Sequence, residues 1–175
     1  MQCLLSAYKI AEYFLNKSYK ENSKNCILKN QKASYALNST ISQMLKAGFQ
    51  SYIEGKEIRK VISNYMNVYI QQDAHEFLIK FMSLLQDEEN IKISHSKIQN
   101  ENIKDAISEY KLYNRSLIDQ LFSGFFSNEV KCLNCNNLSY ALDPFIDINL
   151  PINNDNYSKR TLISLMTKFF KEEVH

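Results

Sequence analysis

The segment Gln71-Gln72-Asp73-Ala74-His75-Glu76-Phe77-Leu78 begins the clearest helical pattern in this sequence of 175 residues. Apolar side chains recur at helical spacing as far as residue 85, and they form one wide face: Ala74, Phe77, Leu78, Phe81, Leu84 and Leu85. The pattern predicts a helix over residues 71–87 that packs against a core through this face.

Helical patterns also precede this segment. We expect a helix from the first residue to Leu15, a second from Ala33 to Leu45 that ends near Gly48, and a shorter third from Ile58 to Tyr65. The polar stretch between the first two, residues 16–31, is predicted to be a loop.

The residues that follow the segment differ in character. Residues 88–114 are mostly charged and polar, so we expect an insertion or mobile loop, with a short helix around residues 103–110. Another short helix is predicted over residues 115–122.

Strand-like stretches begin after Gly124 and are bounded by Pro144 and Pro151. They are followed by an amphipathic pattern at Leu162–Phe170 that predicts a last helix. Helices, then strands, then a helix predict an α+β fold.

Composition restricts the class of protein. The net charge is only +2, with 21 Lys and Arg against 19 Asp and Glu, which argues against nucleic acid or an anionic membrane surface as a partner. No apolar run reaches the roughly 18–20 residues that span a bilayer. The first residues lack the positive region of a signal peptide, and four cysteines are too few for a disulfide scaffold of this size. We therefore expect reduced thiols and a location in the cytoplasm, the nucleus or both.

Two interpretations fit the acidic start of the segment. On a helix, Asp73 and Glu76 are three residues apart and share a face, and Gln72 and Glu76, four apart, do the same. Both acids fall in the first turn. The first interpretation is capping and a favourable interaction with the helix dipole. The second is an acidic, amide-bearing edge that binds a basic, extended peptide. We expect His75 to face solvent.

The sequence Cys132-Leu133-Asn134-Cys135 is a second candidate site, and we expect it at the tip of a hairpin. A Cys-x-x-Cys pair provides half of the four ligands that a structural zinc ion needs. Inert reduced thiols and a redox dithiol are the alternatives. We expect Cys3, which has apolar neighbours, to be a core residue.

Together these segments resemble the ubiquitin-specific protease family of papain-like cysteine deubiquitinases. The segment at residues 71–78 resembles the family's Q-Q-D-A-x-E-F-L helix, and Met1-Gln2-Cys3-Leu4 with Tyr13-Phe14-Leu15 resembles the end of its cysteine box. Residues 116–135 and 139–152, with Asp143-Pro144-Phe145 in the latter, are similar to the stretches that enter and follow the family's fingers.

The resemblance implies a papain-like fold and thiol-dependent hydrolysis of the (iso)peptide bond after the C-terminal glycine of ubiquitin. The implied partners are ubiquitin and ubiquitinated proteins, and no cofactor is required for catalysis. Gln72, Asp73 and Glu76 would line the channel for the ubiquitin tail. Residues 1–122, with the polar insertion 88–114, would form the helical thumb, and residues 124–175 would begin the fingers and palm.

The chain also departs from the family pattern. The nucleophilic cysteine would lie eight positions before Cys3, upstream of Met1, and the histidine and its Asp or Asn partner would lie downstream of His175. The second Cys-x-x-Cys pair is absent as well, so Cys132 and Cys135 would complete a structural zinc site only in a full-length parent. We therefore expect a partial catalytic domain, truncated at both ends and inactive alone. The alternative is a non-catalytic ubiquitin-binding or scaffold module derived from the family.

Overall fold

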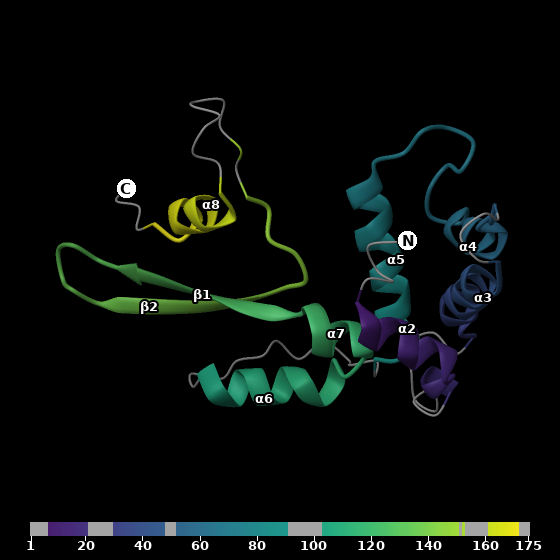
Figure 1. Cartoon of the computed structure of the whole chain (residues 1–175). Helices are drawn as coiled ribbons and strands as arrows, with labels where there is room; N and C mark the ends of the chain where they lie inside the picture. Colours follow the sequence, from purple (N-terminus) through teal and green to yellow (C-terminus); the bar gives the residue numbers. More distant parts are fainter. Residues whose placement is uncertain are drawn as a thin grey trace. The chain divides into compact units, whose positions relative to one another are not determined.

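The apolar periodicity of the quoted segment corresponds to helix α5 (Ala74–Asp87) in the computed structural model (Figure 1). Its predicted face points into a core, because Phe81 and Leu85 are fully buried. The helix begins three residues later than predicted. Asp73 has an extended backbone (φ −65°, ψ 130°) and caps the helix from outside it.

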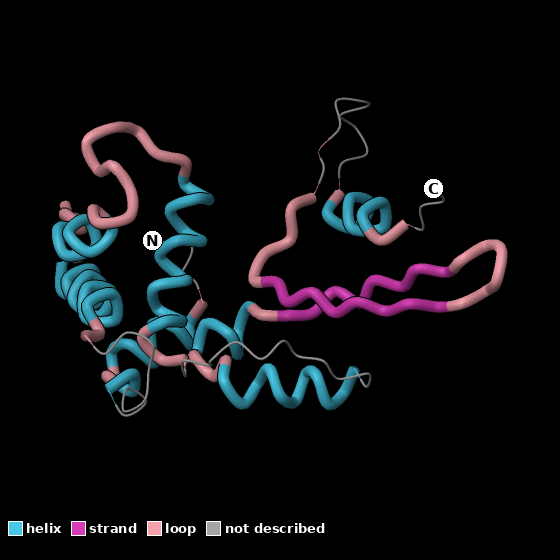
Figure 2. Tube along the Cα trace, turned by 180° about the vertical axis from the view of Figure 1, so that it is seen from behind, coloured by secondary structure: helices cyan, strands magenta, loops and turns pink. Residues whose placement is uncertain are grey.

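The structure describes residues 7–20, 30–47, 52–90, 103–150, 152 and 161–171. The chain forms two compact units, Met1–Leu121 and Phe122–His175. Figure 2 shows that the first unit is helical and that both strands belong to the second. The predicted α+β fold is confirmed. No helix among the described residues has the length and apolar character needed to cross a bilayer.

Around α5, the elements of the first unit are α2 (Tyr8–Leu15), η1 (Ser18–Lys20), α3 (Lys32–Ala47), α4 (Lys56–Ile62), α6 (Ile103–Tyr113) and α7 (Leu117–Phe122), whose last residue begins the second unit. All of the helices that the sequence predicts are present. The helix expected around residues 103–110 extends to Tyr113. The part of the first predicted helix before residue 7 lies outside the described residues.

The core of the first unit is apolar and joins α2, α3, α4, α5 and α7. Its buried large side chains are Ile10, Phe14, Tyr19, Leu37, Ile41, Ile58, Ile62, Phe81, Met82, Leu84, Leu85 and Ile118. Complete burial of one such side chain stabilises a fold by about 1.5–3 kcal/mol. The helices therefore depend on each other, since short helices are marginal in isolation.

Two local predictions for this unit are wrong. Residues 18–20, within the predicted loop, form η1, and Tyr19 is buried while its carbonyl accepts a hydrogen bond from Gln31 Nε2 (2.9 Å). Tyr65 lies beyond the end of α4 and is exposed, with the Lys80 ammonium 5.2 Å from its ring centroid. Periodicity alone did not reveal that the chain turns after Ile62.

The prediction that the polar insertion begins at residue 88 is also wrong. Glu88 is only 2% exposed, and its carboxylate binds the first turn of α3. It accepts hydrogen bonds from the amide of Ala33 (2.7 Å) and from the amide and hydroxyl of Ser34 (2.8 and 2.6 Å). A helix start leaves backbone donors unpaired, and a carboxylate also suits the positive end of the helix dipole. A side chain 55 residues away in sequence therefore caps α3.

Glu89 and Asn90 bind the start of α7 in the same way. Glu89 Oε2 accepts from the Leu117 amide (3.0 Å), and Asn90 Oδ1 accepts from the amides of Arg115 (3.0 Å) and Ser116 (2.9 Å). Asn90 Nδ2 also donates to Asp119 Oδ2 (2.7 Å). The three residues after α5 thus fix two other helices, and the hydrogen bonds that they accept offset part of the cost of burying them. Residues 91–102 lie outside the described residues.

The second unit is built on a hairpin of β1 (Gly124–Lys131) and β2 (Leu138–Phe145), which pair antiparallel from Gly124↔Phe145 to Lys131↔Leu138. β2 includes Pro144 and ends at Phe145, so the strand predicted to continue to residue 150 is shorter. α8 (Leu162–Phe169) confirms the last predicted helix, and Thr161 begins it with a capping box.

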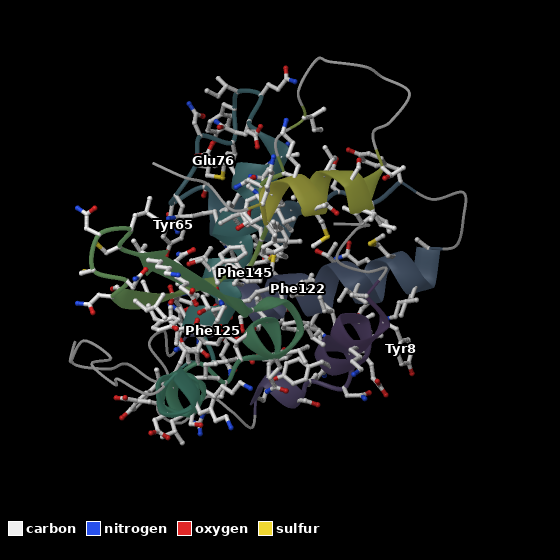
Figure 3. All side chains as sticks on the ribbon, turned by 90° about the vertical axis from the view of Figure 1, so that its left-hand side faces the viewer. Tyr8, Tyr65, Glu76, Phe122, Phe125 and Phe145 are labelled. Atoms are coloured by element: carbon white, nitrogen blue, oxygen red, sulfur yellow. The ribbon has the colours of Figure 1, made fainter. Side chains whose placement is uncertain are left out.

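Aromatic rings pack across the open end of this hairpin. The rings of Phe126 and Phe145 are stacked with their centroids 4.2 Å apart, and Phe126 also contacts Phe169 of α8 (5.6 Å). Figure 3 labels Phe145, Phe122 and Phe125. Glycine is needed at position 124, because an added Cβ would lie 2.9 Å from Phe145 Cε1.

Replacing Glu88 tests the dependence of α3 on this carboxylate. We expect Glu88→Ala to lower the free energy of unfolding by at least about 3 kcal/mol, because it leaves three buried donors unpaired at about 1–3 kcal/mol each. Chemical denaturation followed by circular dichroism measures the change. The control is Glu54→Ala, which removes an exposed ion pair with Lys56 and should have little effect. Equal effects of the two substitutions would contradict the capping role of Glu88.

Candidate functional site

The first candidate site lies at the N-terminal end of α5. Asp73 is the N-cap, and its Oδ1 accepts a hydrogen bond from the Glu76 amide (2.8 Å). Hydrogen bonds from the backbone of Glu76 and His75 hold the pKa of the Asp73 carboxyl below its ordinary value. The geometry of Asp73 thus supports the capping interpretation.

The acidic edge itself is open to solvent. Asp73, His75 and Glu76 are all exposed, which confirms the prediction for His75, and Figure 3 shows Glu76 at the exposed start of the helix. Neither Asp73 nor Glu76 forms an ion pair with a Lys or Arg among the described residues. Two carboxylates are therefore available to a basic partner in addition to the capping bond.

Gln72 does not share a helix face with Glu76 as predicted, because it precedes the helix. Its side-chain Nε2 donates instead to the carbonyl of Asn67 (2.8 Å). Asn67 in turn accepts a hydrogen bond from the Tyr69 amide on its Oδ1 (3.0 Å), as asparagine commonly does in turns. Asn67 therefore fixes the loop before α5 and orients the Gln72 amide, a role that the helical pattern did not reveal.

A cavity of about 470 Å³ adjoins the site. Gln72 and Phe77 form part of its lining, and much of the rest comes from apolar side chains of α4 and the loops on either side of it: Tyr52, Ile53, Ile58, Ile62, Met66, Val68 and Ile70. Three charged residues, Glu54, Lys56 and Arg59, also line it. Tyr52 and Ile70 on this lining are exposed. Apolar walls with a few convergent polar groups are typical of binding sites. The site thus combines an acidic edge, an oriented amide and an apolar hollow.

The second candidate site is the turn of the hairpin in the second unit. The Cys132 amide donates to the carbonyl of Asn137 (2.9 Å), and the Asn136 amide donates back to the carbonyl of Cys132 (2.9 Å). Asn136 adopts the left-handed conformation (φ 56°) that such a tight turn requires. Cys132 and Cys135 are both exposed free thiols, so the predicted hairpin tip is confirmed.

The electrostatics of this turn favour a thiolate. Backbone hydrogen bonds from Cys135 and Asn134, and then the Cys135 thiol, lower the pKa of the Cys132 thiol. Two such sulfurs fit one half of a tetrahedral zinc site. Among the described residues, however, no group of three or more potential ligands comes together, so the remaining two ligands are not found there.

Two of the cysteines and two of the histidines lie in segments that the structure does not describe. Cys3, Cys26, His95 and His175 lie outside the described residues. The expectation that Cys3 is a core residue therefore stays a prediction.

Comparison with known proteins identifies the family. The family model described as ubiquitin carboxyl-terminal hydrolase matches residues 1–169. The chain belongs to the ubiquitin carboxyl-terminal hydrolase family. The resemblance seen in its motifs is thereby confirmed, and the start of α5 lies within a stretch that matches this hydrolase family.

Individual members of the hydrolase family match nearly the whole chain. Ubiquitin carboxyl-terminal hydrolase 2 of Bos taurus is 27% identical over 190 residues, covering 99% of this chain and 31% of the relative. The Usp2 enzyme of Drosophila melanogaster is 27% identical over 187 residues (99% and 19%), and ubiquitin carboxyl-terminal hydrolase 32 of Mus musculus is 27% identical over 172 residues (90% and 11%). The chain thus spans less than a third of the length of these relatives.

The environment of Cys132 leads to a prediction about its reactivity. We expect iodoacetamide to alkylate Cys132 with a pH midpoint below the ordinary thiol pKa of 9.0, because hydrogen bonds stabilise its thiolate. Peptide mass spectrometry after timed labelling at several pH values measures the rate. Cys135→Ala is the matched control: it removes the bond from the Cys135 thiol but keeps the backbone donors, so the midpoint should stay low. A midpoint at or above 9.0 in the unmodified chain would rule out this view of the turn.

Proposed function

We propose that this chain provides the part of a deubiquitinase that binds the C-terminal tail of ubiquitin. The parent protein would hydrolyse the (iso)peptide bond after the C-terminal glycine of ubiquitin, and its partners would be ubiquitin and ubiquitinated proteins. The observation that carries the proposal is the exposed start of α5, where Asp73 and Glu76 lie beside the Gln72 amide and an apolar cavity.

Charge and hydrogen bonding support a basic, extended ligand at this site. Asp73 and Glu76 offer negative charge where the tail of ubiquitin is basic. Gln72 Nε2 is engaged by the Asn67 carbonyl, so the Oε1 atom remains to accept a hydrogen bond from a peptide amide. An extended peptide also presents alternate side chains, and the cavity lined by Phe77 and Ile70 can accept an apolar one.

The capping role and the binding role of Asp73 can be separated by substitution. Asn caps a helix as well as Asp does, so Asp73→Asn should leave α5 intact and remove only the charge. We expect Asp73→Asn and Glu76→Gln each to weaken binding of a peptide with the C-terminal sequence of ubiquitin by roughly two- to fivefold, as is typical of exposed charge pairs. Fluorescence anisotropy of a labelled peptide measures the affinity.

The matched control for this experiment is Glu57→Gln, which removes an acid from the first turn of α4. It should leave the affinity unchanged. Binding should also weaken as salt is raised, because the charges are exposed. Unchanged affinity in the double variant Asp73→Asn, Glu76→Gln, with a circular dichroism spectrum like that of the original chain, would refute the site.

We further propose that these 175 residues alone do not hydrolyse ubiquitin conjugates. By resemblance to the family, the positions of the nucleophilic cysteine and of the histidine fall outside them, and catalysis of this type needs both groups within hydrogen-bond reach. The expected result is no release of fluorophore from a ubiquitin C-terminal fluorogenic substrate. Turnover that disappears in Cys3→Ala would show instead that Cys3 is the nucleophile.

The zinc hypothesis is a separate proposal. Cys132 and Cys135 would provide two thiolates of a structural site, and two further ligands are needed to complete it. The metal would hold the hairpin turn and take no part in hydrolysis. We also propose that the protein acts in the cytoplasm, the nucleus or both, since its thiols are expected to be reduced.

A further inference from the structure

A third carboxylate, Glu89, is buried without the set of donors that its neighbours have. Its side chain is only 2% exposed, at the end of α5. Oε2 accepts a hydrogen bond from the Leu117 amide (3.0 Å), while Oε1 is buried and makes no hydrogen bond of good geometry. The Tyr13 hydroxyl of α2 interacts with the same carboxyl and favours its charged form, while Oε1 itself has no hydrogen-bond partner among the described residues.

The charged groups that face Glu89 are acids. Glu88 precedes it in the same turn, and Asp119 faces it from α7. No Lys or Arg among the described residues forms an ion pair with Glu88 or Glu89. Glu89 is therefore buried beside two other acids, where a charged carboxylate is unfavourable.

The two neighbouring acids, Glu88 and Asp119, accept more hydrogen bonds than Glu89 does. Glu88 accepts three hydrogen bonds from the start of α3. Asp119 accepts hydrogen bonds from Gln86 (2.8 Å), Asn90 (2.7 Å) and Ser116 (2.5 Å). These hydrogen bonds give both carboxylates several donor partners in the buried cluster. Glu89 has one backbone donor. The free energy of the cluster is therefore lowest when Glu89 is the neutral member.

We propose that Glu89 carries a proton in the folded helical unit, and that loss of this proton opens the contact between the end of α5 and the start of α7. A proton on Oε1 converts the unpaired acceptor into a donor, which can pair with the Tyr13 hydroxyl. Oε2 continues to accept from the Leu117 amide. When the proton is lost, the charged carboxylate needs water, and water reaches it only if α7 moves away.

The pKa of Glu89 agrees with this mechanism. Burial is the largest effect and raises the pKa of its carboxyl. Hydrogen bonds from the Leu117 amide and Tyr13 lower the pKa by less, and the charges of Glu88 and Asp119 raise it by smaller amounts still. A group whose pKa is higher in the folded state contributes stability at low pH. That contribution is lost as the pH rises through the folded value, which lies above the ordinary 4.5. The start of α7 is thus expected to open less often in mild acid than at alkaline pH.

Hydrogen exchange in the full chain tests the proposal, with the Leu117 amide as the local probe. After correction for the intrinsic pH dependence of exchange, we expect the opening constant at this amide to rise about tenfold between pH 5 and pH 8. Glu89→Gln should abolish the rise, because glutamine is neutral at every pH and keeps an oxygen for the Leu117 amide. Its opening constant at pH 8 should match that of the original chain at pH 5.

A second variant distinguishes the proton from general damage to the cluster. Glu88→Gln places an amide group against the donors of α3, so it should lower the protection of the Ala33 and Ser34 amides from exchange at every pH. The pH dependence of the opening constant at Leu117 should remain. The proposal is overturned if the opening constant of the original chain does not change with pH. It is also overturned if Glu89→Gln opens α7 at pH 8 more than the original chain does.

Discussion

The helical unit depends on a short buried segment that supplies hydrogen-bond acceptors to two distant helix starts. Glu88 supplies the acceptors for the first turn of α3, and Glu89 and Asn90 supply those for α7. Buried backbone donors at a helix start must find partners, since each unpaired donor is costly. Residues 88–90 meet this requirement for two helices at once. The end of α5 therefore joins α3 and α7 to the core.

This arrangement determines what the other end of α5 can do. The helix is about 21 Å long, at 1.5 Å per residue. Because its C-terminal end is fixed by hydrogen bonds and its apolar face is buried, its N-terminal end is held rigidly although Asp73 and Glu76 are exposed. A binding edge on a rigid element needs little reordering when a ligand arrives. Anchoring at one end and recognition at the other are consequences of the same helix.

The sequence predicts the elements better than it predicts their ends and partners. Apolar periodicity located the helices and the last amphipathic stretch, because burial of one face is a local pattern. It failed at residues 88–90, where polar side chains are buried only because donors 25 to 55 residues away meet them. One trace of this network was readable: Ser116 accepts from the Asp119 amide, three residues on, as in a capping box. The membership of Gln72 in the site was predictable, but its orientation by Asn67 depends on the path of a loop.

The proline within β2 has a consequence for association between copies of the protein. Pro144 lies opposite Phe125 in a two-stranded hairpin, so both strands have an outer edge. Unpaired strand edges are templates on which another chain can add a strand, and this leads to misassembly. A proline carries no N–H and is tolerated in an edge strand where that group would face outward. Pro144 thus leaves β2 with one backbone donor fewer, which makes the strand a poorer template for pairing with another chain.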